Sequence, residues 1–285
     1  MACYHPWTPE PSMGLAPHIK LKCGQCIGCR LERSTTWATR CWHHAQLYQQ
    51  NAFITLTLDD AKIDQARSLD HRLWQLFMKK LRRRSDAKLS YYMAGEYTPS
   101  TQRPHYHACI FNYDFQDKKY WKKTKGGFRL YTSELLEKIW GHGFTSTGDV
   151  TFESAAYIAR YIVAKITGPN SERFYERIDE TTGEIYQLKP EYNRMSLNPA
   201  IGKPWLEKYT ADVYPEGQVL IRNSKIKAPK YYDSQYEKAE PENHKQMLKA
   251  RNALMQTLRG DNTPRRLAAK EKVKLAQVNQ LLRTL

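Results

Sequence analysis

Residues 103–111 read Arg-Pro-His-Tyr-His-Ala-Cys-Ile-Phe, and this stretch decides the fold that the rest of the chain completes. The residues after Pro104 are bulky, aromatic or otherwise suited to a β-strand, so a strand is predicted over 104–112. Because side chains alternate between the two faces of a strand, His105 and His107 share one face. Two neighbouring imidazoles can clamp a divalent metal, although many such pairs are merely exposed strand residues.

The segments around this strand predict an α+β chain. The predicted elements are a helix over 31–50, a strand over 52–58, a helix after Asp70, strands over 91–97 and 104–112, a charged loop over 118–127, a helix near 132–140, a strand near 144–152 and a helix near 154–166. This order fits an antiparallel sheet with helices on one face, the split βαβ or ferredoxin-like arrangement.

The helix that follows Asp70 is predicted to be amphipathic, with Asp70 as its N-cap. Its expected inner face consists of Leu73, Leu76, Phe77 and Leu81. It ends in a basic run, Lys79, Lys80, Arg82, Arg83 and Arg84. These cations suit the negative end of the helix dipole and are candidate contacts for DNA phosphates, but a solvated helix end explains them equally well.

The composition indicates a polyanionic partner. The 285 residues include 45 basic and 29 acidic side chains, a net charge of +16, with 41% hydrophobic and 12% aromatic residues. Nucleic acid is the expected partner of such a surplus when the charges cluster. The sequence contains no apolar run of membrane-spanning length and no signal peptide, so we expect a cytoplasmic protein without membrane contact.

Four regions are predicted along the chain. Residues 1–50 form a Cys-rich segment and a helix, and residues 51–168 form the core. Residues 169–232 are interpreted as an insertion, followed by an extended segment that packs back on the core. Residues 233–285 are predicted to be a basic helical tail, which is ordered either by itself or on nucleic acid.

The six cysteines of a cytoplasmic chain are expected to be thiols or metal ligands rather than disulfides. Cys23, Cys26 and Cys29 recur at intervals of three, and Cys3 lies upstream as a fourth candidate ligand for structural Zn²⁺. Free thiols packed beside the helix are the alternative. Iron–sulfur ligation is a further reading of the spacing, but the Cys-Pro that would follow is absent.

A second group of candidate residues lies on the predicted helix near 154–166. Tyr157 and Tyr161 are four residues apart and Lys165 follows four later, which puts two phenols and an ammonium on one face. Half-buried packing tyrosines are the bland alternative. A phenol becomes a useful nucleophile toward a phosphodiester when a cation assists it, and a divalent ion held by two histidines supplies that assistance.

Two imidazoles leave a hard cation such as Mg²⁺ or Mn²⁺ short of ligands, because these ions prefer octahedral, largely oxygen coordination. Glu96 is the obvious third ligand. It lies on the preceding strand, and the hairpin between the two strands brings it beside the histidines. A strand-end carboxylate that faces solvent remains the alternative for Glu96.

The ordered motifs resemble those of a known family. Phe53 to Leu58, the run from Gly95 to Phe111 and the run from Tyr157 to Lys165 resemble the three motifs of the replication initiators of microviruses, particularly the gokushovirus type. Those proteins belong to the HUH endonuclease superfamily. Cys23-Gly-Gln-Cys-Ile-Gly-Cys-Arg30 and the run from Ile201 to Trp205 are also similar to this group. The resemblance covers about residues 1–232.

The resemblance implies a rolling-circle initiator with an HUH nuclease core. Such a protein nicks the viral strand at the phage origin, stays attached to the 5′ end through a tyrosine and later rejoins the strand. It implies His105 and His107 as metal ligands with Glu96, and Tyr157 and Tyr161 as nucleophiles. No phosphate-binding loop of the Gly-x-x-x-x-Gly-Lys type is present, so strand separation is expected from a host helicase and replication machinery.

Two other readings remain open at this point. A transposase or relaxase of the same superfamily would use similar chemistry, and gene context would separate it from an initiator. A non-catalytic single-stranded DNA-binding protein would use its tyrosines and histidines for stacking rather than for cleavage. It would form no covalent adduct with DNA.

Overall fold

The structure of the protein is a computed structural model. It describes residues 3–14, 19–62, 68–98, 102–164, 171–178 and 182–280, with the side chains at 160–164, 171 and 259 outside the description. The chain divides into two compact units. The first, called the helical unit, contains residues 1–39 and 206–283; the second, called the sheet unit, contains residues 40–205. Each unit is described by itself.

The sheet unit is built on a seven-stranded sheet in the order β4-β5-β6-β1-β3-β2-β9. The strands are β1 (Asn51–Thr57), β2 (Ser90–Tyr97), β3 (Pro104–Phe111), β4 (Lys119–Lys123), β5 (Arg129–Thr132), β6 (Thr145–Asp149) and β9 (Tyr192–Met195). All paired neighbours are antiparallel. Because β3 lies between β1 and β2, the β1–helix–β2 unit is split by an intervening strand, as the sequence predicts.

One face of this sheet packs against α2 (His71–Arg82) and α3 (Glu134–Trp140). Alternate residues of the central strands point to this side, among them Ile54, Tyr106 and Ile110. The predicted N-cap is confirmed, since the Asp70 carboxylate accepts a hydrogen bond from the Arg72 backbone N–H at 2.9 Å. The main core of the unit therefore lies between the sheet and these two helices.

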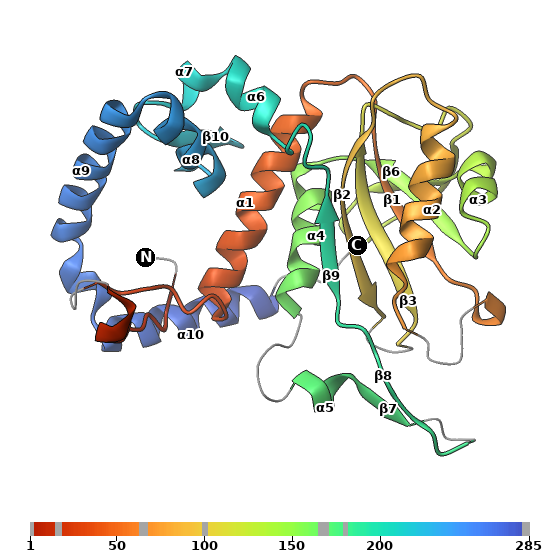
Figure 1. Ribbon diagram of the computed structural model, residues 1–285, viewed down its shortest axis with the longest axis horizontal. Helices are drawn as coiled ribbons and strands as arrows, with labels where there is room; N and C mark the ends of the chain where they lie inside the picture. The colour runs from red at the N-terminus through yellow and green to blue at the C-terminus, as the bar shows by residue number, and fades with distance from the viewer. Residues whose placement is uncertain are drawn as a thin grey trace. The chain divides into compact units, whose positions relative to one another are not determined.

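The opposite face packs against α4 (Phe152–Ala164), which contacts β2, β3 and β9. The end of α1 (Ile27–Ala45) also reaches this face, where His44 Nε2 and Ser90 Oγ are hydrogen-bonded at 2.8 Å. Figure 1 shows α4 on the other side of the sheet from α2 and α3. The predicted α+β class with a helix-flanked antiparallel sheet is confirmed, but helices cover both faces rather than one.

Three local expectations differ from the structure. On α2 the buried residues are Trp74, Phe77, Met78 and Leu81, while Leu76 is exposed. The expected charged loop over 118–127 contains β4, which pairs with β5 as a hairpin. Residues 170–193, expected as a loop, hold α5 (Ser171–Tyr175) and a hairpin of β7 (Glu176–Ile178) and β8 (Ile185–Gln187).

The helical unit contains the predicted helical C-terminal region. Its elements, with α6 beginning in the sheet unit, are α6 (Lys203–Lys208), α7 (Thr210–Val213), β10 (Gln218–Ile221), β11 (Ser224–Lys227), α8 (Lys230–Ala239), α9 (Pro241–Thr257) and α10 (Pro264–Gln280). Asp233 of α8 ties part of it together, because its carboxylate pairs with Arg251 at 2.7 Å and accepts the Tyr214 hydroxyl at 2.9 Å. None of the described helices has the length and apolarity to cross a bilayer.

Candidate metal and nucleic-acid site

The predicted metal ligands come together on the sheet face that α4 covers. Glu96 of β2 lies directly opposite His105 of β3 in the antiparallel ladder. Glu96 Oε1 is 2.9 Å from His105 Nε2 and 2.7 Å from His107 Nε2. The register thus directs one carboxylate and two imidazole nitrogens at a common point, where they form a candidate three-residue metal cluster.

Burial tunes the charges of this cluster. Glu96 is 2% exposed and His107 is 5% exposed. Burial raises the pKa of Glu96 to about 7, against the opposing effect of its hydrogen bond to His105. Burial also lowers the pKa of His107 to about 3. The His107 imidazole is therefore neutral at physiological pH, which is the form that binds a metal.

Two threonines orient the imidazoles. Thr55 Oγ1 of β1 is hydrogen-bonded to His107 Nδ1 at 2.9 Å, and Thr98 Oγ1 is hydrogen-bonded to His105 Nδ1 at 3.1 Å. Both bonds occupy the Nδ1 atoms and leave the Nε2 atoms directed at Glu96. The sequence reasoning missed both threonines. For Thr55 a signal was present, because the β1–β3 pairing places it opposite His107.

The residues fit a divalent ion on two further grounds. Nitrogen from two imidazoles and oxygen from one carboxylate is a donor set that Mn²⁺ and Mg²⁺ accept when water completes the coordination. The second oxygen of Glu96, Oε2, is buried and has no hydrogen-bond partner within the described part of the chain. A buried carboxylate oxygen without a donor is costly, and a bound cation would satisfy it.

Tyr157 lies against this cluster. Its ring meets the His107 ring edge-on, with ring centroids 5.0 Å apart, and it also contacts Phe53 at 6.3 Å. Tyr161 follows one turn later on α4, but its side chain lies outside the described residues, as does all of Lys165. The structure therefore brings Tyr157 to the predicted metal ligands and leaves the other two residues as predictions.

The basic run at the end of α2 is exposed, as expected for either a phosphate contact or a solvated helix end. Its members Lys79, Arg82, Arg83 and Arg84 lie on the surface, and so does the neighbouring Lys80. However, α2 packs on the sheet face opposite to the one that carries His105 and His107. A role for these residues in DNA binding stays a prediction. Cations that share the face of the metal cluster must be sought elsewhere.

Comparison with known proteins identifies the family. The family model for replication-associated proteins of the ORF2 type matches residues 51–166. The replication-associated protein VP4 of Bdellovibrio phage phiMH2K is 36% identical over 232 residues, which cover 77% of this chain and 68% of that protein. The chain belongs to the family of phage replication-associated proteins.

A second member extends the comparison. The replication-associated protein ORF2 of Spiroplasma virus 4 is 30% identical over 230 residues, which cover 76% of this chain and 67% of that protein. No solved structure gives a significant match. The resemblance to microvirus replication proteins is thus confirmed. The family match includes Thr55, Glu96, both histidines and both tyrosines, so the whole candidate site lies inside it.

Proposed function

We propose that this phage replication-associated protein is a metal-dependent tyrosine endonuclease that starts rolling-circle replication by nicking single-stranded DNA at the viral origin. The observation that carries the proposal is the contact of Tyr157 with His107, inside a cluster that also contains Glu96 and His105. A nucleophile candidate beside three metal-ligating side chains is the arrangement that phosphodiester transfer requires.

The proposed reaction exchanges one phosphodiester for another. The phenol oxygen of Tyr157 or Tyr161 forms a bond to the scissile phosphorus, and the P–O3′ bond breaks. The phenol proton is lost to solvent and the departing oxygen takes up a proton, which leaves a free 3′-hydroxyl and a 5′-phosphotyrosine. Because one ester replaces another, the reaction needs no external energy source and can run backwards to join strands.

The chain's own residues have distinct parts in this proposal. Glu96, His105 and His107 would hold the ion, and Thr55 and Thr98 would keep the imidazoles in orientation. A bound Mg²⁺ or Mn²⁺ would polarise a non-bridging phosphate oxygen as a Lewis acid. The second tyrosine, one turn along α4, would accept a second strand without release of the first, and Lys165 would stabilise phenolate or phosphate charge.

We also propose the cellular setting. Single-stranded DNA at the phage origin is the substrate, and the cytoplasm of the bacterial host is the compartment in which it is replicated. A host helicase and the host replication machinery would separate and extend the strands. The net charge of +16 supports a polyanionic substrate.

An adduct assay tests the function directly. Purified protein is incubated with Mn²⁺ and single strands that tile the phage genome, each labelled either at its 3′ end or at its 5′ end. We expect one region to give an adduct that survives heat and detergent, and only with the 3′ label, because the tyrosine keeps the 5′-phosphate side. EDTA should abolish it, since the phosphate then loses its Lewis acid.

The controls separate the alternatives. Adduct formation that persists in EDTA would remove the metal from the mechanism. Tight binding of single strands with no adduct at any tile would favour the non-catalytic DNA-binding reading. An adduct that carries the 5′ label would reverse the proposed polarity of attack.

A further inference from the structure

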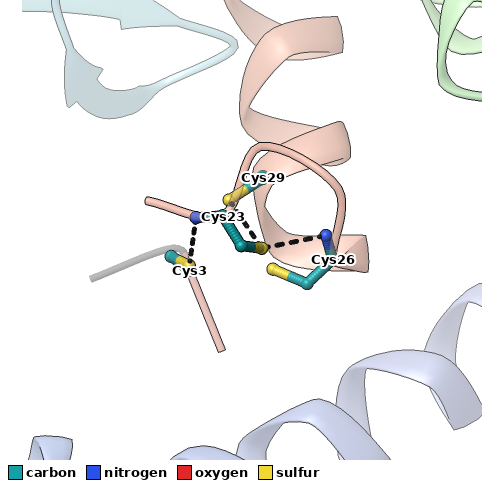
Figure 2. Close-up of side chains that lie close together, drawn as sticks. All are labelled: Cys3, Cys23, Cys26 and Cys29. Carbon is teal, nitrogen blue, oxygen red and sulfur yellow. Dashed lines mark hydrogen bonds between the residues drawn. The ribbon is translucent and has the colours of Figure 1, made fainter. Parts of the chain in front are cut away.

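Four cysteines of the helical unit gather at one point, away from the candidate nuclease residues in the sequence. The Sγ atoms of Cys3, Cys23, Cys26 and Cys29 all lie within 4.8 Å of one another, and Cys23 and Cys29 are 4.0 Å apart. All four are free thiols rather than disulfides. Figure 2 shows the four side chains converging from the N-terminal segment and the start of α1.

These separations suit a single tetrahedral ion. With Zn–S bonds of about 2.3 Å, four thiolates around one zinc lie about 3.8 Å from one another. A four-iron cluster would hold its thiolates farther apart, because each binds a different iron. The distances within the cluster therefore favour one metal ion over an iron–sulfur cluster.

The backbone around the cluster is arranged to stabilise negative sulfur. Backbone N–H groups of Tyr4, Cys23 and Cys26 donate to the Sγ atoms of Cys26, Cys3 and Cys23 respectively, each at 3.3 Å. Hydrogen bonds of this kind offset the charge of metal-bound thiolates. Cys29 lies in the first turn of α1, where the positive end of the helix dipole acts in the same direction.

The local fold brings the cysteines together from distant positions. Trp7 and Leu21 form an antiparallel bridge, with reciprocal backbone hydrogen bonds of 3.0 and 2.9 Å, which places Cys3 beside Cys23. Gly24 has φ +75°, and this left-handed turn lets the chain curl from Cys23 back toward Cys26. Four ligands from two segments are thus held by backbone geometry.

The N-terminal segment has little else to hold it. Among the described residues before α1, the buried side chains are those of Cys3, Pro9 and Cys26. A segment with so small an apolar core needs a cross-link, and a structural metal is a common one in small folds. We propose that Cys3, Cys23, Cys26 and Cys29 bind one structural Zn²⁺, which fastens the N-terminal segment to the start of α1.

The metal content of the protein tests this proposal independently of nicking. The test uses the full chain carrying His105→Ala and His107→Ala, because the candidate nuclease site could itself bind zinc. We expect one zinc per chain after dialysis, and a near-complete loss of it when Cys23→Ala is added. Cys41→Ala and Cys109→Ala are the matched controls, since these buried cysteines lie outside the cluster and should leave the zinc unchanged.

A second measurement needs no cysteine variant. Growth in Co²⁺ should give the intense visible bands of tetrahedral cobalt with thiolate charge transfer, and limited proteolysis after chelation should cut before α1. A metal-free protein whose four thiols react at once with a thiol reagent would overturn the proposal. So would bound iron, or zinc that survives Cys23→Ala.

A different observation carries a second inference, which concerns the sheet unit and rests on the proposed function. Trp121 of β4 and Phe144, just before β6, are 41% and 45% exposed, and their ring centroids are 4.9 Å apart. Lys122 Nζ lies 3.9 Å from the Trp121 ring centroid. Exposed aromatic rings beside cations are the surface on which unpaired bases stack.

The register places this aromatic pair on the same sheet face as the metal cluster. The Thr57 backbone N–H donates to the Phe144 carbonyl at 2.9 Å, which puts Phe144 opposite Thr57. Thr57 is in turn opposite His105. Directly opposed residues in an antiparallel sheet point the same way, so Phe144 lies two strands, or about 10 Å, from His105 on one face.

The surrounding charge suits a polyanion. The β4–β5 hairpin carries the exposed cations Lys122, Lys123, Lys125 and Arg129. The sequence contains no acidic residue between Asp117 and Glu134. We infer that Trp121 and Phe144 form a stacking platform that holds bases of single-stranded DNA next to the phosphate at the metal site.

DNA binding without cleavage tests the platform. In EDTA, fluorescence anisotropy with a labelled single strand should give about tenfold weaker binding for Trp121→Ala and for Phe144→Ala, because each loses a stacked base. Trp121→Phe should bind nearly as wild type. Tyr120→Ala is the matched control, since Tyr120 is 61% exposed on the same strand but contacts Tyr131, which pairs toward the opposite sheet face.

The outcomes are distinct from those of the adduct assay, because no metal and no covalent step is involved. Unchanged binding in both alanine variants would overturn the platform even if nicking is found. An equal loss in Tyr120→Ala would also overturn it, since a face-specific platform predicts a difference between the two aromatic residues.

Discussion

Replacement of both tyrosines of α4, as Tyr157→Phe with Tyr161→Phe, is expected to abolish the covalent protein–DNA adduct while single-strand binding stays close to that of wild type. Each change removes only a hydroxyl group. The Tyr157 ring keeps its edge contacts with His107 and Phe53, so folding should be unaffected. Loss of the attacking oxygen removes the covalent step, and we expect a fall of at least about a thousandfold.

The two single variants assign the order of attack. If Tyr157 attacks first, Tyr157→Phe alone should lose the first adduct, whereas Tyr161→Phe should keep it and fail only in the rejoining step. Tyr120→Phe is the control for general effects of a removed phenol, since Tyr120 lies on β4. An adduct that forms at the wild-type rate in the double variant would exclude both residues as nucleophiles.

The central fold was predictable because its elements carry strong periodic patterns. Alternation over β1 and β3, together with the capped amphipathic α2, fixes an antiparallel sheet with a helix packed on one side. The second helical layer was harder to foresee. Both faces of a central strand are apolar when helices cover both, and β3 therefore shows no polar face that would have indicated solvent.

The strands β4 and β9 escaped prediction for different physical reasons. All five residues of β4 are exposed, so the strand lacks the alternation that marks a half-buried one. β9 is a short edge strand that pairs with β2 from far along the chain. Neither its length nor its local composition distinguishes it from a loop, because tertiary pairing rather than propensity makes it a strand.

The candidate site shows the same division. Glu96, His105 and His107 were predictable because a short hairpin determines which residues of adjacent strands meet. Thr55 was harder to assign, since its bond to His107 depends on the pairing of β1 with β3 across a long stretch of sequence. Chemistry that is local in sequence can be read from the sequence, whereas long-range orientation requires the register.

Removal of a single metal ligand has the second large expected effect. His105→Ala should lower the nicking rate by about a hundredfold to ten-thousandfold, because a metal ion commonly contributes several kcal/mol to phosphoryl transfer. His105 is the ligand best suited to this test, since its side chain is less buried than those of Glu96 and His107. Added Mn²⁺ should restore the activity only in part, because one imidazole ligand is permanently absent.

A graded series distinguishes loss of the ligand from loss of the fold. Thr55→Val keeps the shape of the side chain but removes the hydroxyl that is bonded to His107 Nδ1, and it should weaken Mn²⁺ binding by about tenfold to a hundredfold. His71→Ala, a histidine hydrogen-bonded to Tyr192 away from the cluster, should leave Mn²⁺ binding unchanged. Calorimetric titration of the DNA-free protein with Mn²⁺ measures all three variants. Wild-type affinity in His105→Ala would show that the cluster is not the metal site, and the mechanism would then have to draw its cation from elsewhere on the chain.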